Sequence, residues 1–151
     1  MPVTSMAMSA RVTGRSDLVT MVHPQSSWGF NQHLGEVPMQ IHPHIFREYD
    51  IRGIAGKDLD ETTYETVGKA VCAFMKGKLK KKTLVVGRDG RLTSKAYANA
   101  LIDGITSCGV NVIDIGEVPT GLLYFGLFTL PVDGGVMITA SHNPKEYNGM
   151  K

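Results

Sequence analysis

The sequence predicts an α/β fold in which helices cover both faces of a mostly parallel or mixed sheet. Three short apolar runs, at 83–87, 110–115 and 135–139, alternate with helical periodicity at 93–108 and 120–129. A further helical stretch at 60–78 precedes them. Strands that alternate with helices imply crossover connections, which place helices on the faces of the sheet. We therefore expect a three-layer α/β/α domain over residues 41–151, incomplete at its carboxyl end.

The first helix is expected at 60–78. Asp60 is placed to cap its amino end, and Glu61 puts a negative charge in the first turn, where the helix dipole favours it. One face carries apolar side chains at helical spacing, namely Tyr64, Val67, Val71, Phe74 and Met75. Lysines gather at 76–82. A phosphate-binding patch is one interpretation, but cations also complement a helix carboxyl end, which favours a solvated terminus.

The later segments repeat one pattern, in which a buried strand leads through a polar turn to a helix. The run 83–87 ends in glycine, and after the turn 88–91 Thr93 is placed to cap a helix that extends to Cys108. Its inner side is predicted to hold Tyr97, Leu101, Ile105 and Cys108, and Gly109 suits a left-handed terminator. The strand 110–115 and loop 116–120 lead to a helix from Thr120 or Gly121 to about residue 129.

Three polar loops therefore follow carboxyl ends of predicted strands: 88–91, 117–120 and 140–148. Parallel strands bring these ends to one edge of the sheet, and open α/β sheets bind ligands there. We expect the three loops to face the same side and to form one site.

Residues 1–40 differ from the rest of the chain. They are rich in Met, Ser, Thr, Val and Gln and show no sustained period of strand or helix. The basic, acid-poor start resembles a transit peptide, but it lacks dense arginine and an amphipathic stripe, and no apolar segment suits a signal peptide. We expect an irregular or disordered leader, with Met39 as a natural beginning for the folded part.

Composition narrows the class of protein. A formal charge of +2 is too small to indicate a nucleic-acid partner, and no apolar run is long enough to span a membrane. Cys72 and Cys108 fall within helical patterns and show no metal-ligand spacing, so they are expected to be small apolar core residues. These features favour a reducing compartment and a cytoplasmic location.

The segment after the last predicted strand is the most informative in the chain. It presents Ser141, His142, Asn143 and Pro144 at the end of a buried run. A serine hydroxyl needs a base or a charge field to act as a nucleophile, and a neighbouring histidine in a loop often points away. The sequence lacks GxSxG, which argues against a hydrolase elbow. A plain polar turn, capped by Ser141 and formed by Asn143 and Pro144, is an equally weighted alternative.

Arginines in loop-like segments suggest a phosphorylated ligand, because the guanidinium fork matches phosphate oxygens. Those concerned are Arg47, Arg52, Arg88 and Arg91, with Lys145 and Lys151 nearby. The alternative is local pairing of Arg47 with Glu48, Arg52 with Asp50, and Arg88 with Asp89. We expect Asp89, flanked by Arg88 and Arg91, to make a structural pair, and we favour a functional role for Arg52.

Four motifs in order resemble the α-D-phosphohexomutase superfamily, of the phosphomannomutase/phosphoglucomutase type. They are FREYDIRG at 46–53, VGRDGR at 86–91, EVPT at 117–120, and ITASHNP at 138–144 with YNGMK at 147–151. Their order and spacing agree with the first of that family's four domains, from about residue 44 onward. The segment 46–53 resembles the mannose/glucose branch rather than phosphoglucosamine mutases.

The resemblance implies a mechanism and a set of site residues. Ser141 would be a phosphoserine that exchanges its phosphoryl group with hexose 1- and 6-phosphates through a bisphosphate, and Mg²⁺ would bind one oxygen of that phosphate. Lys151 would be a candidate for acid/base work, with Arg52 also close to the reacting hydroxyl. Tyr49 and Arg52 would line the cleft, and His142 and Asn143 would support the loop. Arg88 would hold loops in place.

The chain departs from this family in length. The metal, sugar and distal phosphate loops of the later domains are absent from the sequence, so the fragment alone is expected to lack mutase activity. We also expect the first domain to end before its closing strand and helix, which would leave the final strand partly uncovered and give an aggregation-prone monomer. Two alternatives stay open: a non-catalytic module that binds a phosphorylated ligand or partner, and an unrelated Rossmann-like domain with a chance serine loop.

Overall fold

The computed structural model describes residues 20–22, 41–79 and 82–151. Within them, six strands form one sheet in the order β1-β4-β3-β5-β6-β2. The strands are β1 (Thr20–Val22), β2 (Ile51–Ile54), β3 (Thr83–Arg88), β4 (Asn111–Glu117), β5 (Gly134–Ile138) and β6 (Tyr147–Met150). The helices are α1 (Glu61–Phe74), α2 (Ser94–Ser107) and α3 (Thr120–Thr129), with a 3₁₀ turn at Pro43–Ile45 and a π-helical turn at Met75–Leu79.

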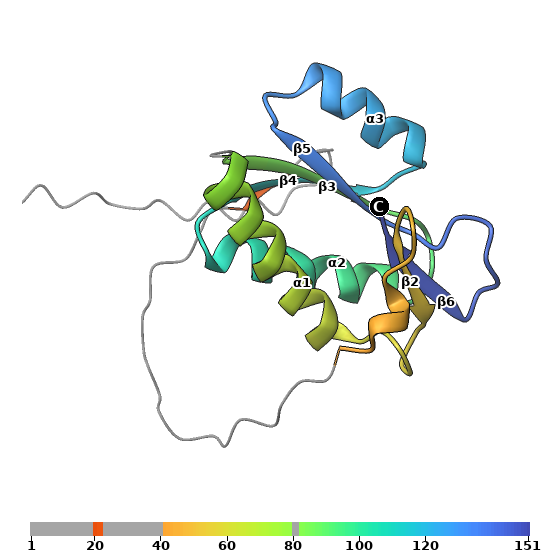
Figure 1. Ribbon diagram of the computed structural model, residues 1–151. Coiled ribbons are helices and arrows are strands. Elements are labelled where there is room, and N and C mark those ends of the chain that lie inside the picture. Colours follow the sequence, from red (N-terminus) through yellow and green to blue (C-terminus); the bar gives the residue numbers. More distant parts are fainter. Residues whose placement is uncertain (1–19, 23–40, 80–81) are drawn as a thin grey trace, which may run out of the picture.

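The sheet is mixed and lies between helices. β3 pairs in parallel with β4 and β5, while β1–β4, β5–β6 and β6–β2 are antiparallel. Figure 1 shows α1 and α2 on one face of the sheet and α3 on the other. The predicted three-layer α/β/α architecture is therefore confirmed.

Two apolar clusters hold the layers together, and β3 contributes to both because its side chains alternate. Leu84 and Val86 pack in the larger cluster under α1 and α2. Val85 points the other way and packs beneath α3 with Leu123 and Met137. The core residues of β3 are nearly or fully buried, so this strand is the centre of the molecule.

The predicted helices agree with the structure, with local differences. Asp60 caps α1 by accepting from the Thr63 N–H at 2.7 Å. Phe74, predicted on the inner face, is 54% exposed, because Cys72 takes the buried position and a π-helical turn follows at once. Thr93 stands at the cap position of α2 but makes no side-chain cap hydrogen bond. Gly109 has φ +90°, as a left-handed terminator requires.

Two strands and one turn differ from the sequence prediction. β2 and β6 lie in segments interpreted as loops. The sequence of 41–49 has an extended character, but its residues Pro43–Ile45 form a 3₁₀ turn. The final strand β5 pairs along its length with β3, but β6 pairs with it only at its end, at Ile138, so the prediction of a partly uncovered final strand agrees with the structure. Strands as short and polar as β6 are recognised by their pairing with a neighbour and not by an apolar run.

The exposed surface of α3 supports the expectation that the chain associates with itself. α3 is apolar around most of its circumference and leaves four large apolar side chains exposed, namely Leu122, Tyr124, Phe125 and Phe128. Contiguous exposed apolar surface is an association hazard. An aggregation-prone monomer thus stays a prediction, with α3 as its basis.

The predicted leader lies mostly outside the described residues. Its one described segment, β1, pairs antiparallel with β4, with Met21 opposite Ile113. The boundary at residue 41 therefore stays a prediction. No helix in the described part of the chain is long and apolar enough to cross a membrane.

Candidate functional site

Ser141 lies in the turn that joins β5 to β6. Buried Thr139 and Ala140 carry the chain out of the sheet, and the serine itself is exposed. Its φ of 57° is the only left-handed backbone outside glycine among the described residues. The turn is fixed on both sides, since Ser141 N–H donates to Thr139 Oγ1 at 2.9 Å and Asn143 N–H to the Ala140 carbonyl at 3.1 Å. Backbone held in a disfavoured region is typical of functional sites.

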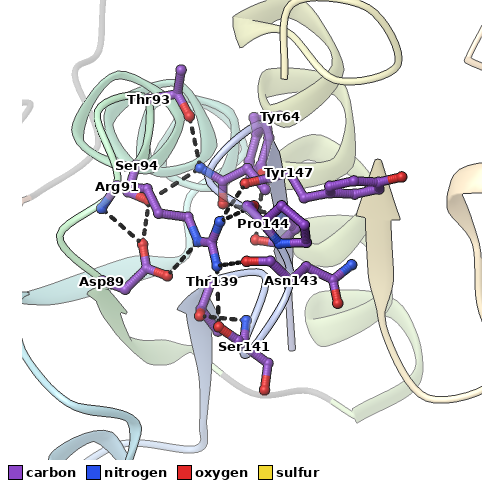
Figure 2. A network of polar contacts seen from close by, with 12 residues as sticks. Tyr64, Asp89, Arg91, Thr93, Ser94, Thr139, Ser141, Asn143, Pro144 and Tyr147 are labelled. Atoms are coloured by element: carbon purple, nitrogen blue, oxygen red, sulfur yellow. Dashed lines mark hydrogen bonds and ion pairs between the residues drawn. The ribbon is translucent and has the colours of Figure 1, made fainter. Parts of the chain in front are cut away.

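Arg91 organises this loop from the neighbouring strand's turn. Its guanidinium donates to the carbonyl oxygens of Pro144 (2.6 Å), Tyr147 (2.9 Å), Ser141 (3.1 Å) and Asn143 (2.7 Å). Figure 2 shows the side chain reaching into the middle of the loop. One arginine therefore satisfies four carbonyls that the irregular loop leaves without strand partners.

Asp89 anchors Arg91 in turn. It accepts from Arg91 Nε at 3.0 Å, from the Arg91 N–H, and from Ser94 Oγ at 2.6 Å at the start of α2. Burial alone would raise the pKa of Asp89, but hydrogen bonds from Ser94, Thr139 and Arg91 outweigh it and lower the pKa below its ordinary value. The carboxylate stays charged and fixes the guanidinium under the loop.

Asn148 ties the other end of the loop to α2. This side chain is fully buried and donates to Thr93 Oγ1 at 2.9 Å and Ser94 Oγ at 3.1 Å. Tyr64 on α1 adds a hydrogen bond to the Gly149 carbonyl at 3.0 Å. The loop thus rests on the amino ends of both helices, as the contacts in Figure 2 show.

Beside the loop lies a hollow of about 440 Å³. Arg52 on β2 reaches across it, with Nη1 donating to Asn143 Oδ1 at 3.0 Å and Nη2 paired with Asp50. Arg52 Nε is buried and has no hydrogen-bond partner among the described residues. The lining consists of Arg47, Glu48, Tyr49, Asp50, Arg52, Asn143 and Tyr147. The two guanidinium groups can bind an anionic ligand, but Glu48 and Asp50 in the same lining balance their charge.

The predicted site residues do not all meet in this hollow. Tyr49, Arg52 and Asn143 line it, whereas Ser141 and His142 are exposed on the same loop outside its lining. No described side chain hydrogen-bonds the Ser141 hydroxyl, so His142 does not form a dyad with it. The predicted turn at 140–144 is present, but its cap is Thr139 and not Ser141.

Lys151 follows β6 and is exposed. Its N–H and carbonyl pair with Met137 on β5, both at 2.9 Å. Met150 packs toward α1 and α2, as does Ile51, its partner on β2. Because side chains alternate along strands, Lys151 and Arg52 project from the opposite face of the sheet. The structure therefore places both cations on one face of neighbouring strands.

The ion pairs differ in part from the predicted local ones. Arg88 pairs with Asp114 at 3.3 Å, across the bulge that Gly116 makes in β4, so its predicted pairing with Asp89 is wrong. Asp89 pairs with Arg91 instead. Arg52 does pair with Asp50, while Arg47 makes no ion pair with Glu48 in the described part of the chain.

Residues 43–151 match the family model described as phosphoglucomutase/phosphomannomutase, alpha/beta/alpha domain I. The chain belongs to this family. A phosphomannomutase of Vibrio cholerae is 50% identical over 107 residues, which cover 70% of this chain and 23% of the relative. A phosphomannomutase/phosphoglucomutase of Pseudomonas putida is 44% identical over 115 residues, which cover 76% of this chain and 25% of the relative.

Solved structures agree with this assignment. A phosphoglucomutase/phosphomannomutase family protein from Burkholderia thailandensis aligns with a TM-score of 0.70 at 39% identity, covering 74% of this chain and 26% of that one. A protein from Thermus thermophilus that is provisionally assigned as a phosphomannomutase aligns with a TM-score of 0.64 at 34% identity, covering 68% of this chain and 23% of that one. The chain spans about a quarter of the length of these relatives.

Sequence reasoning missed the two residues that shape this domain I site most. Arg91 was expected only to flank Asp89 in a structural pair or to suit a phosphorylated ligand, and its four contacts to the serine loop were not predicted. Asn148 belongs to the motif YNGMK at 147–151 but was assigned no role from the sequence, although its side chain is fully buried. A useful signal would have been an asparagine within an otherwise apolar and glycine-rich strand, because a buried amide needs partners.

The described residues do not form a magnesium site by themselves. No group of three or more His, Cys, Asp or Glu side chains among them is placed to hold a metal ion. A phosphate on Ser141 would offer an oxygen, whereas Mg²⁺ requires near-octahedral oxygen coordination. A metal at this loop would need most of its ligands from elsewhere.

Proposed function

We propose that this chain is the serine-bearing first domain of a phosphohexomutase that interconverts hexose 1-phosphates and hexose 6-phosphates of mannose or glucose. The observation that carries the proposal is the Ser141 loop, in which an exposed serine with φ 57° is held by four carbonyl contacts to Arg91 beside the Arg52–Asn143 pair. Such rigid presentation of a nucleophile, next to cations, is what phosphoryl transfer needs.

In the proposed reaction, Ser141 carries a phosphoryl group. The bond from phosphorus to Ser141 Oγ breaks while a bond to the sugar hydroxyl oxygen forms, and Lys151 accepts the hydroxyl proton. The resulting bisphosphate returns its other phosphoryl group to Ser141 by the reverse of these steps. Arg52 neutralises charge on the transferring group and fixes Asn143 through its 3.0 Å hydrogen bond.

The other residues have supporting roles in this proposal. Tyr49 and Arg52 line the hollow for the sugar phosphate, and His142 and Asn143 shape the loop around Ser141. Mg²⁺ is the proposed cofactor, bound in part through the phosphate on Ser141, and it would neutralise charge on that phosphate. A cytoplasmic location completes the proposal, since free Cys72 and Cys108 suit a reducing compartment.

A chimaera tests the proposal directly. Residues 43–151 would replace the matching first domain of the Vibrio cholerae relative, and turnover of glucose 1-phosphate and mannose 1-phosphate would be measured with Mg²⁺. We expect activity in the chimaera, a loss of at least a thousandfold in Ser141→Ala, and a phosphate on Ser141 by peptide mass. The 151-residue chain alone should be inactive.

The outcomes separate the alternatives. A folded chimaera that is inactive, with a melting transition like the relative's, would favour a non-catalytic module. Equal activity in Ser141→Ala would show that the serine is not the phosphoryl carrier. Turnover by the isolated chain, purified from a host without its own mutase, would contradict the need for later domains.

A further inference from the structure

Two thiols that the proposed reaction does not use lie at the carboxyl ends of α1 and α2. Cys72 is in the last turn of α1 and is fully buried, and Cys108 caps α2 and is half-buried. Burial raises the pKa of Cys72, and Cys108 contributes to this rise, as expected for neighbouring thiols. Cys72 belongs to the larger apolar cluster and Cys108 packs against it. One thiol of this pair is therefore buried in the apolar cluster, and the other, packed against that cluster, is accessible to solvent.

The packing of the two helices explains why the thiols meet. Near the amino ends the rings of Tyr64 and Tyr97 stack with centroids 4.4 Å apart. In the middle the backbones nearly touch, since a Cβ on Gly68 would lie 2.4 Å from the Leu101 carbonyl oxygen. A Cβ on Gly104 would lie 2.1 Å from the Glu65 carbonyl oxygen. The helices thus run side by side in the same direction at very short range.

Cys72 and Cys108 each lie one helical turn beyond these glycines, on the same side of the helices. Close backbones bring the Cβ atoms of facing residues within the short range that a disulfide requires. The carboxyl ends of the two helices are also joined by a hydrogen bond, since Lys76 Nζ donates to the Cys108 carbonyl at 2.7 Å. Both thiols are free in the structure, so a bond between them requires the two sulfur atoms to move together.

We propose that Cys72 and Cys108 form a redox-responsive pair that closes to an intramolecular disulfide on exposure to a peroxide and reopens with a dithiol. Cys108 reacts first, because it is the thiol that solvent reaches. Its sulfur attacks one peroxide oxygen, the O–O bond breaks, and sulfenic acid and water form. The Cys72 sulfur then attacks the sulfenic sulfur, the S–S bond forms, and a second water leaves. Two thiols lose two electrons in total, and one peroxide gains them.

The surroundings of Cys72 agree with this order. Burial raises the pKa of Cys72 to about 11, and the nearby charge of Lys76 only partly opposes that effect. A thiol held in its neutral form is a poor first target for peroxide, because the thiolate is the reactive form, and Cys72 attacks the sulfenic acid of Cys108 as it loses its proton.

The pair is separate from the serine loop. The loop rests on the amino ends of the helices, through Tyr64 and the start of α2, whereas the thiols lie at the carboxyl ends. A disulfide would tie α1 to α2 across a long stretch of chain, which restricts the unfolded state and stabilises the fold. Closure should therefore change stability without removing any contact of the site.

The experiment uses the reduced 151-residue chain. It would be treated with hydrogen peroxide, blocked with iodoacetamide and analysed by intact mass, peptide mapping and thermal melting. We expect a loss of two hydrogens, a linked peptide pair containing Cys72 and Cys108, and a melting temperature higher by about 5–15 °C. Dithiothreitol should reverse all three changes.

Single variants provide matched controls. Cys72→Ala should leave a sulfenic acid on Cys108 that dimedone traps, and Cys108→Ala should show neither a disulfide nor a shift in melting temperature. Alkylation of both thiols after peroxide treatment, or a disulfide only between two chains, would overturn the proposal. A closed bond that lowers the melting temperature would also overturn it, by showing that the helices do not fit the bond.

Discussion

At the scale of single residues, Arg91 has a role that no other described residue shares. Its guanidinium joins four carbonyls of the serine loop to one carboxylate, Asp89. Lysine keeps the charge but offers a compact ammonium in place of a planar fork, so it cannot reach these acceptors together. The geometry at Ser141 therefore depends on the shape of Arg91 as much as on its charge.

We predict that Arg91→Lys destabilises the chain by about 2–3 kcal/mol, because several part-buried carbonyls lose a charged donor. Urea unfolding would measure the loss, and hydrogen exchange should rise at the amides of 140–149. Arg47→Lys is the control, since Arg47 is exposed and should change stability by less than about 0.5 kcal/mol. Equal effects of the two substitutions would contradict this role for Arg91.

The sequence revealed the serine loop but not its support. Ser141 and Asn143 were identified because they follow an expected strand, and Arg52 because it is an arginine in a loop-like segment; their roles came from the family resemblance. Arg91 and Asn148 were missed, because their roles depend on which carbonyls and hydroxyls approach them in space. Partners of that kind come from tertiary structure, and local spacing does not encode them.

At the scale of elements, helices were easier to predict than strands. The amphipathic periods of α1 and α2 and the cap at Asp60 are local signals, and they agree with the structure. β2 and β6 lack such signals, since Gly53, Asn148 and Gly149 are allowed by pairing with a neighbouring strand. Gly149 also permits close approach, because a Cβ there would lie 2.1 Å from the Ile51 carbonyl oxygen.

The contact between α1 and α2 gives a prediction at this scale. Alanine normally stabilises a helix relative to glycine by up to about 1 kcal/mol. At Gly68 and Gly104 the added methyl group would meet backbone of the facing helix, which cannot move aside as a side chain can. Gly68→Ala and Gly104→Ala should each destabilise the chain by about 2–4 kcal/mol.

Gly121→Ala in α3 is the matched control, since nothing lies within 4 Å of a Cβ there. It should be neutral or slightly stabilising in the same thermal or urea unfolding measurement. If all three substitutions stabilised the chain, helix propensity and not helix contact would control the effect.

At the scale of the whole molecule, the layered architecture was predictable because the order of apolar and amphipathic segments determines which faces need cover. The position of β1 was not, since pairing with β4 joins segments far apart in the chain. The electrostatic interactions show the same difference between features encoded locally and features that depend on tertiary structure. Local motifs identify caps such as Asp60, while the network at Asp89 exists only in the folded protein.

Three carboxylates connect folding to pH. The pKa of Asp58 is lowered by the N–H of Ile54, and that of Asp60 by the hydroxyl and N–H of Thr63. At Asp89 burial opposes the lowering, but hydrogen bonds from Ser94, Thr139 and Arg91 exceed it. All three folded pKa values lie below the unfolded value of 3.8. The three carboxylates therefore stabilise the folded state fully above pH 3.8, and this stabilisation is lost as the pH falls through their lower folded-state pKa values.

We predict that the melting temperature is nearly constant from pH 7 to pH 5 and falls steeply below about pH 4. Asp60→Asn separates the titration from the cap, because asparagine caps a helix about as well as aspartate but carries no proton equilibrium. This variant should have the same melting temperature as the parent chain at pH 7, and its melting temperature should fall less than the parent's at pH 3. Asp103→Asn, at an exposed position on α2, should reproduce the parent profile. Parallel profiles for all three proteins would show that acid unfolding has another origin.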